Sequence, residues 1–382
     1  MSAPRPSGRG LGFALAAVGA LLGGPALANE FPLQPGQTVV GQVGDYVVRP
    51  GDTLMSIARG ADLGYTELLA ANPGPIHPWD PGVGRHLKIP SAFILPDAPH
   101  IGIVINLAER RLYYFPPDGE TVETYPVGIG VEGRTTPLST TRIVAKETDP
   151  TWYPPPSIRA ERPELPAAIG PGPDNPLGKY ALRLGWKNYL IHDTNKPDGV
   201  GRNVSHGCIH LYPADIERLF NEVAVGTQVR ALEQPAAAAW IDDGLYVEVH
   251  PDKRQADQID MQQPVSRAEP AGLREMVTQV AGQYSAAVNW NAVRTAGLER
   301  TGLPVEVAKR EPGSAPAPVA SLPARTRSPT YDQASRRAFD DVIDEAIGSG
   351  DDEGPIRSSA SYDAAAGPDD GIYDPDLDRP RR

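Results

Sequence analysis

The chain has 382 residues and a single cysteine, Cys208. One thiol cannot form a disulfide framework, and it cannot supply the several thiolates of a structural zinc site. Cys208 lies in the stretch NVSHGCIHLYPADI, residues 203–216, with one histidine two positions before it and another two positions after it. These two histidines make the Cys208 thiol a candidate nucleophile or metal ligand. Whether an unpaired cysteine is expected to be reactive depends on the cellular compartment of the protein.

The first 28 residues contain the three parts of a secretory signal peptide. Arg5 and Arg9 supply positive charge, residues 11–22 are apolar and uncharged, and residues 26–28 form a small-x-small cleavage pattern. The apolar run is shorter than the roughly 20 residues of a membrane span, and no later segment is long and apolar enough to span a bilayer. We therefore expect an exported protein, in which an odd cysteine is reactive or intermolecular. A retained N-terminal anchor is the alternative.

The amino-acid composition separates a folded, loop-rich part of the chain from an acidic C-terminal tail. The 42 prolines and 39 glycines are typical of a loop-rich β protein with disordered segments, and the net charge of −12 argues against a nucleic-acid binder. Residues 309–382 are rich in Pro, Ala, Ser, Asp and Gly, which predicts a disordered acidic tail. Within it, residues 335–347 carry an apolar helical stripe, either a transient helix or one that docks on a partner.

Residues 45–90 predict a small β-α-α-β unit. A strand over residues 46–49 precedes a helix capped by Asp52 or Thr53, Thr66 caps a second helix, and HLKIP forms the closing strand. The segments YVVRPGDTLMSIA, ELLAANP and LKIP resemble the LysM module. The resemblance implies binding of N-acetylglucosamine-containing glycans of peptidoglycan or chitin, through loops after Gly51 and around residues 69–73. A packing domain without a ligand is the alternative.

Residues 100–250 predict a second, β-dominated domain. Its longest loop, residues 149–179, is rich in proline, and a helix beginning at Pro213 follows the cysteine. GTQVRAL and LYVEVH are expected to finish its sheet. Residues 263–308 predict two helices, with Trp290 between them, as an extension packed on this domain. The strands are expected at 101–107, 110–115, 121–130 and 140–147.

Three histidines are candidates to activate the thiol: His192, His206 and His210. Gly207 allows a tight turn in which successive N–H groups converge, as the oxyanion of an acyl substrate requires. Two other interpretations remain open. Cys208 could be an inert buried residue, or it could bind a metal with His206 and His210 if all three alternate along one strand.

The stretch IHDTNKPDGVGRNVSHGCIHLYPADIERLF resembles the signature of the L,D-transpeptidases, the YkuD-type catalytic domain. INLAERRLYYFPPDG and YPVGIG upstream follow the order of that family. The resemblance implies a β-dominated α+β fold with a LysM module ahead of the catalytic domain. It implies Cys208 as nucleophile and His192 as proton acceptor and donor, oriented by the backbone carbonyl of Asp193. Ser205 and His206 match the motif, and the N–H groups of His206, Gly207 and Cys208 match its oxyanion hole.

The chain departs from the family pattern at three places. His210 stands where the family usually has Arg or Asn, Asp193 where it has Gly or Ser, and TPLS at residues 136–139 replaces a TPTG-like turn. A carboxylate at Asp193 would favour the imidazolium form of His192. His210 and Asn195 are assigned to substrate binding.

The resemblance implies that Cys208 takes the acyl group of a peptidoglycan tetrapeptide stem, releases D-alanine and passes the stem to an amine. The amine belongs to another stem or to an outer-membrane protein or lipoprotein, and the location is the periplasm of a Gram-negative cell. No cofactor or metal and no nucleic acid is expected. Three alternatives remain: water as acceptor, making a carboxypeptidase or hydrolase; an inactive wall-binding protein; or a cysteine peptidase of another architecture. Residues 149–179 are expected to form a lid.

Overall fold

The structure, a computed structural model, describes residues 29–131 and 136–310. These residues belong to one of two compact units of the chain, and the other unit, residues 1–27 and 331–350, lies outside them. The expected signal peptide, the tail beyond residue 310 and its apolar stripe therefore also lie outside the described residues. Within the described ranges, no helix has both the length and the apolar character needed to cross a bilayer.

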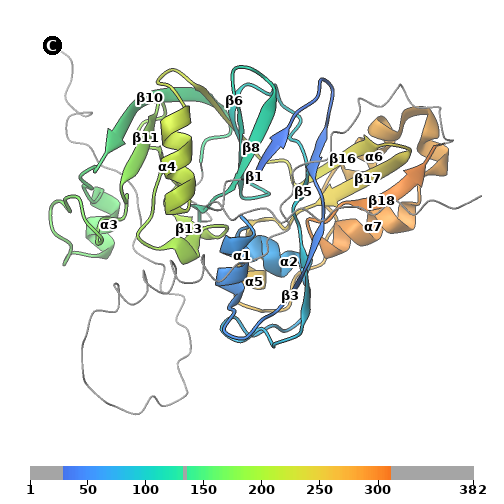
Figure 1. The fold of residues 1–382 in the computed structure, drawn as a ribbon, viewed down its shortest axis with the longest axis horizontal. Helices are drawn as coiled ribbons and strands as arrows, with labels where there is room; N and C mark the ends of the chain where they lie inside the picture. The colour runs from blue at the N-terminus through green and yellow to red at the C-terminus, as the bar shows by residue number, and fades with distance from the viewer. Residues whose placement is uncertain (1–28, 132–135, 311–382) are drawn as a thin grey trace, which may run out of the picture. The chain divides into compact units, whose positions relative to one another are not determined.

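A nine-stranded sheet forms the centre of the described chain (Figure 1). The expected strands over 101–107, 110–115 and 140–147 are confirmed, because residues with alternating or continuously buried side chains extend there. The strand expected over 121–130 is divided: β8 ends at Pro126, and β9 Ile129–Gly130 pairs outside this sheet. β12 and β14 pair in parallel, as do β15 and β6, and the other pairs are antiparallel. The strands in sheet order are β1 Asn29–Pro32, β8 Thr121–Pro126, β7 Arg111–Phe115, β6 Gly102–Asn106, β15 Gln228–Leu232, β10 Thr140–Thr148, β11 Tyr180–Leu184, β12 Leu190–His192 and β14 Ile209–His210.

Helix α4, Pro213–Glu222, follows the cysteine directly and covers one face of this sheet (Figure 1). Pro213 occupies the first turn, where its missing N–H costs nothing. Ile216 and Leu219 lie one turn apart and are fully buried in the same core as Ile143 of β10. The predicted helix is confirmed, and its packing holds β14 and the preceding turn against the sheet.

The β-α-α-β unit is confirmed as β3 Gly44–Val47, α1 Leu54–Gly60, α2 Tyr65–Ala71 and β4 His86–Ile89, with β3 and β4 antiparallel. Thr53 caps α1 through the Ser56 N–H, as one of the two predicted caps. The predicted cap of α2 is wrong. Gly64 precedes that helix, and Thr66 lies inside it, where its hydroxyl contacts a residue almost two hundred positions away.

The LysM-like unit shares a core with the sheet. Leu54 and Leu63 belong to the same buried cluster as Val104 of β6. Arg111 of β7, almost fully buried, forms a 2.7 Å ion pair with Glu67 of α2. Removing one partner would leave an uncompensated buried charge, so the pair specifies this arrangement. On either side of the unit, β2 Val39–Gly41 pairs with β5 Ala92–Ile94.

The C-terminal part differs from the sequence prediction. The segment LYVEVH does not finish the large sheet, because β17 Gly244–Val249 pairs with β16 Ala236–Ile241 and β18 Val305–Lys309 in a sheet of its own (Figure 1). The two expected helices are confirmed as α6 Leu273–Ala281 and α7 Trp290–Glu299, although Trp290 begins α7 rather than separating the pair. β18 crosses the predicted boundary at residue 309, and α5 Lys253–Asp260 was not predicted.

The remaining short elements surround the cysteine or join the larger ones. The proline-rich segment contains one six-residue helix, and the strand before the cysteine pairs in parallel with a two-residue strand. These elements are β9 Ile129–Gly130, α3 Pro156–Glu161, the 3-10 helices η1 Pro197–Gly199 and η2 Gly282–Ala287, and β13 Asn203–Ser205.

Candidate active site

Cys208 lies in the turn between β13 and β14, and its side chain is 1% exposed. Its Sγ is 3.8 Å from the carbonyl oxygen of Asn188, which belongs to the hairpin between β11 and β12. The thiol belongs to a buried cluster with Leu190 of β12 and Trp152 of the proline-rich segment. The nucleophile candidate is therefore enclosed from several directions.

His192 and Cys208 lie on the same face of the sheet. β12 and β14 pair in parallel, with His192 opposite His210 and Ile191 opposite Ile209. Ile191 and Ile209 point into the core beneath α4, whereas Leu190 and Cys208 share the cluster on the other face. Since side chains alternate along a strand, His192 projects on the face that carries Cys208. Its ring lies 4.6 Å, centre to centre, from the ring of His210.

The hydrogen bond of His192 defines its tautomer. Its Nδ1 donates to the backbone carbonyl of Asp193, which as a carbonyl can only accept. The proton therefore resides on Nδ1, and Nε2 carries the lone pair that a general base needs. Nε2 is buried and has no hydrogen-bond partner among the described residues. Burial lowers the pKa of His192 to about 4, and the bond to Asp193 opposes this shift. The imidazole is neutral at pH 7.

The carboxylate of Asp193 does not act as expected. Its oxygens accept the N–H groups of Lys179, at 2.9 Å, and Thr194, at 2.7 Å. It therefore holds the backbone around β12, while the lowered pKa of His192 comes from burial and is opposed by the bond to the Asp193 carbonyl. The expectation that this carboxylate favours an imidazolium is wrong, because its lone pairs face backbone donors.

The Ser205 side chain stabilises the turn that carries Cys208 through two hydrogen bonds to its backbone. Its Oγ accepts the N–H of Gly207 at 3.0 Å and donates to the carbonyl of Cys208 at 2.7 Å. Gly207 has a φ of 115°, a conformation that only glycine adopts without strain. Its carbonyl accepts the hydroxyl of Thr136 at 2.8 Å. Of the three N–H groups expected in the oxyanion hole, that of Gly207 is therefore engaged with Ser205.

The other predicted residues have different surroundings. His206 is half-buried, and Asn195 is exposed in the loop after β12. His210 is 3% exposed and packs on His192, and burial together with His192 holds its pKa well below the usual value. The turn interrupts the strand, so Cys208, His206 and His210 do not alternate along one strand. Their donor atoms form no metal-binding group among the described residues.

Two aromatic residues of the hairpin between β11 and β12 were missed from the sequence, and one of them, Tyr189, lies against the turn that carries Cys208. Tyr189 lies so close to Gly207 that a β-carbon on Gly207 would stand 2.7 Å from the Tyr189 ring. Burial raises the pKa of Tyr189, and the charge of Cys208 raises it further. The ring of Trp186 meets that of Tyr189 edge-on, and its indole N–H donates to Ser139 at 3.0 Å. The hairpin sequence GWKNY signals a turn between strands, but it does not show that the turn faces the cysteine.

The proline-rich segment covers the thiol. Trp152, Ile158 and Leu177, from three parts of residues 149–179, pack in the cluster that contains Cys208. Asn175 holds the segment together from within: its amide donates to the carbonyl of Pro150 at 2.7 Å and its oxygen accepts the N–H of Leu177 at 2.9 Å. Residues from three parts of this segment therefore bury the thiol, and a lid role for residues 149–179 stays a prediction.

Replacing Asn175 by alanine is expected to make Cys208 more accessible. The substitution removes the buried hydrogen bonds that close the segment, at a cost of about 1.4 kcal/mol. Lowering the cost of local opening by about 1.4 kcal/mol would raise the open population, and the alkylation rate of Cys208 by a maleimide, roughly tenfold. Glu164→Gln is the control, since it removes an exposed ion pair with Arg162 from the same segment. Equal alkylation rates in wild type and Asn175→Ala would contradict a closing role.

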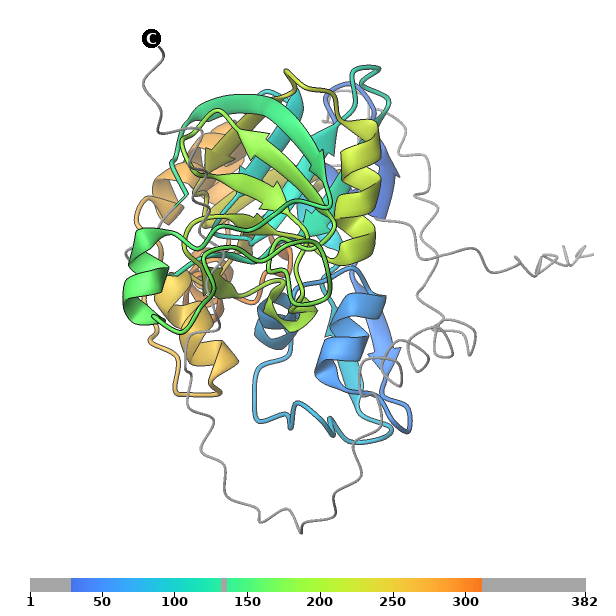
Figure 2. The same cartoon turned by 90° about the vertical axis from the view of Figure 1, so that its left-hand side faces the viewer.

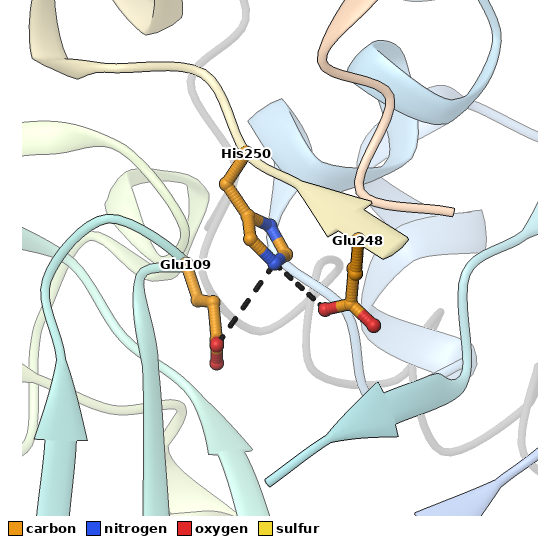
Figure 3. A group of neighbouring side chains, drawn as sticks. All are labelled: Glu109, Glu248 and His250. Carbon is orange, nitrogen blue, oxygen red and sulfur yellow. Dashed lines mark hydrogen bonds and ion pairs between the residues drawn. The ribbon is translucent and has the colours of Figure 1, made fainter. Parts of the chain in front are cut away.

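A second buried cluster lies away from the thiol. His250, just after β17, has its Nε2 2.7 Å from Glu248 and 3.9 Å from Glu109, which precedes β7 (Figure 3). Within the described ranges these three residues are the one group whose geometry could hold a metal ion. Their oxygens are already used: Glu109 accepts from Asn106 and Tyr113, and Glu248 accepts the N–H of Ile94.

Charge also disfavours a cation in this cluster. Burial lowers the pKa of His250, and the neighbouring guanidinium groups of Arg110 and Arg111 lower it further. Burial raises the pKa of Glu109 to about 7 and raises the pKa of Glu248 well above its usual value, which disfavours the paired carboxylates that a cation would need. The cluster is therefore a closed hydrogen-bond network between the catalytic sheet and β17.

Comparisons with known proteins agree with this architecture. Residues 100–230 match the family described as the L,D-transpeptidase catalytic domain, YkuD, and residues 46–90 match the LysM domain. The probable L,D-transpeptidase ErfK/SrfK of Escherichia coli K12 is 40% identical over 295 residues, covering 74% of this chain and 92% of that protein. The probable L,D-transpeptidases YcfS and YbiS of the same strain are 44% and 40% identical, covering 59% and 74% of this chain and 74% and 93% of theirs.

The strand-rich fold and these matches define a cysteine-dependent acyltransferase acting on peptidoglycan. More narrowly, the chain belongs to the L,D-transpeptidase family and carries a LysM domain ahead of its catalytic domain.

Proposed function

We propose that Cys208 is the acylated nucleophile and His192 the group that moves its proton. The observation that carries this assignment is the tautomer of His192, whose buried Nε2 lone pair lies on the face of the sheet that carries the thiol. A neutral imidazole can take the thiol proton directly, which a protonated one cannot. Ser205 positions the turn, and His210 supplies the packed wall behind His192.

Two steps complete the proposed reaction. The Cys208 sulfur attacks the carbonyl of the third residue of a tetrapeptide stem, and the thiol proton moves to His192 Nε2. The tetrahedral intermediate collapses to a thioester as His192 protonates the departing amine of D-alanine. A second amine then attacks the thioester, loses its proton to His192 and forms an amide, and the proton returns to the sulfur. The oxyanion of each intermediate would lie against the backbone of the His206–Cys208 turn.

The LysM domain supplies the proposed glycan contact. The loop after Gly51 adjoins the loop beyond α2, because the Leu54 N–H donates to the Pro78 carbonyl at 2.8 Å. The next residue, Trp79, is 60% exposed, whereas Leu69, which the sequence suggested as a contact, is buried. An exposed indole next to backbone polar groups offers both a stacking face and hydrogen bonds to a sugar ring. We place the glycan there.

The protein is proposed to act in the periplasm and to transfer the acyl group to an amine. The leader-like first 28 residues support export to the periplasm, where both the glycan and the peptide stems are found. The acceptor amine would come from a second stem or from an outer-membrane protein or lipoprotein. Asn195, exposed near His192, is the proposed contact for the peptide.

The mass of the intact protein after exposure to a carbapenem tests the nucleophile. The strained lactam carbonyl of the drug takes the place of the stem carbonyl, so one adduct is expected on the wild type and none on Cys208→Ala. An adduct that persists in Cys208→Ala would overturn the assignment. A wild type that stays unmodified but sediments with peptidoglycan would instead indicate the inactive wall-binding alternative.

A further inference from the structure

We infer that Asp260, the last residue of α5, is a positioning residue that ties the LysM domain to the strand leading into the Cys208 turn. The inference rests on the proposed role of Cys208. It concerns a contact outside the catalytic motif, between three segments far apart in sequence. Figures 1 and 2 show α5 beside the LysM helices and β13.

Asp260 joins two of these segments through its two oxygens. Oδ1 accepts the hydroxyl of Thr66 in α2 of the LysM domain, and Oδ2 forms a 2.9 Å ion pair with Nε of Arg202. The Asp260 side chain is 7% exposed. A buried carboxylate is stable only with such partners, so the two contacts are strongly favoured once the segments meet.

Asn203, the first residue of β13, is held by the same helix. Its amide donates to Asp257 at 2.8 Å and to the carbonyl of Lys253 at 2.9 Å, and its oxygen accepts from Arg110 at 3.2 Å. Arg202 and Asn203, the two residues nearest to the start of β13, therefore both take their position from α5. Only Val204 separates this anchored pair from Ser205.

The LysM domain also touches this segment through bare backbone. A β-carbon on Gly64 would stand 2.5 Å from the Cα of Gly201, so only glycines permit the approach. Beside it, the Tyr65 N–H donates to the carbonyl of Val200 at 3.4 Å. The segment before the catalytic turn is thus enclosed by α2 on one side and α5 on another.

This enclosure reaches the catalytic turn through β13. The carbonyls of Arg202 and Ser205 accept the N–H groups of Ile129 and Val131 at 2.9 and 2.8 Å, and Ser205 then fixes Gly207 and Cys208. Displacing a reacting group by about 1 Å can cost about a hundredfold in rate. Losing one of several anchors is expected to cost roughly tenfold, because Asn203 and the β9 pairing remain.

The test compares four variants of the full chain in their reaction with a carbapenem. Asp260→Asn removes the charge paired with Arg202. Thr66→Val removes the Thr66 hydroxyl at nearly the same side-chain volume, whereas Thr66→Ser keeps a hydroxyl at this position. Asp45→Asn is the control, because it breaks an exposed ion pair of 2.7 Å, with Lys88, inside the LysM domain. The first-order acylation rate constant, the half-saturating drug concentration and the melting temperature are measured for each, at a temperature where every variant is folded.

We expect Asp260→Asn and Thr66→Val to lower the first-order rate constant, the former about tenfold, with the half-saturating concentration unchanged, while Thr66→Ser and Asp45→Asn match the wild type. A lowered melting temperature with a rate constant within twofold of wild type would overturn the inference, since Asp260 would then only stabilise the fold. If Asp260→Asn does not fold, the Thr66 pair decides: equal rates for valine and serine overturn it. A wild type without any adduct would overturn the proposed function itself.

Discussion

Replacing His192 by asparagine is expected to slow formation of the Cys208–carbapenem adduct about a thousandfold. Asparagine can still donate to the Asp193 carbonyl, so the backbone contact survives while the Nε2 lone pair is lost. General base catalysis of this kind contributes roughly 10² to 10⁴ in rate, and no carboxylate stands in for the imidazole, because Asp193 faces backbone donors. Time-resolved mass spectrometry of the intact protein measures the rate, with the exposed His86→Asn as the matched control.

The pH dependence of the same reaction separates His192 from its neighbours. Because the pKa of His192 is lowered to about 4, its neutral, proton-accepting form persists well below pH 6.5. The acylation rate should therefore hold from neutral pH to about pH 5 and fall about tenfold per pH unit below about pH 4. A fall centred near pH 6.5, or a His192→Asn variant as fast as wild type, would move the role of base to the half-buried His206.

The second large effect is expected from Gly207→Ala. Alanine would strain the backbone at a φ of 115°, and its β-carbon would meet the ring of Tyr189 at 2.7 Å. Strain of this kind costs about 1–3 kcal/mol, and relieving the clash would shift the turn that presents Cys208. We expect the acylation rate to fall by about a hundredfold or more, together with a loss of about 2 kcal/mol in the free energy of unfolding.

Gly226→Ala is the matched control for this substitution. Gly226 also has a positive φ, 96°, but a β-carbon there meets no atom within 4 Å. Its alanine variant should lose stability with little change in acylation, whereas Gly207→Ala should lose both. Denaturant unfolding and the adduct assay measure the two effects. Wild-type acylation by Gly207→Ala would show that the turn tolerates a side chain and that Tyr189 does not confine it.

The local patterns in the sequence predict the elements around the site. Alternating runs mark the strands of the large sheet, and Pro213 with its apolar stripe marks α4, because these signals depend only on neighbouring residues. The pairing of His192 with Cys208 came from a resemblance. The register of β12 and β14, which sets His192 opposite His210, is a tertiary feature that no local pattern reveals.

The failures share a physical cause. Thr66 resembles a helix cap, but Gly64 precedes the helix and the Thr66 hydroxyl meets Asp260 instead. The Asp193 carboxylate, a departure from the family pattern, was expected to act on the neighbouring base, whereas the chain brings the Lys179 N–H to it. LYVEVH is a strand as predicted, but its partner β18 lies some sixty residues later. Each error concerns a tertiary contact, which a single sequence read locally does not show.

The shared core between the LysM domain and the sheet, with the Arg111–Glu67 pair inside it, fixes the distance between a glycan bound to the LysM domain and Cys208. A binding module on a flexible linker lets an enzyme sample every site within a sphere set by the linker length. Here the module has no such freedom. A bound sugar would therefore present only those stems that lie at one displacement and one orientation from it. The position of a transferred stem would then be set by the geometry between the bound sugar and Cys208 rather than by the local density of stems.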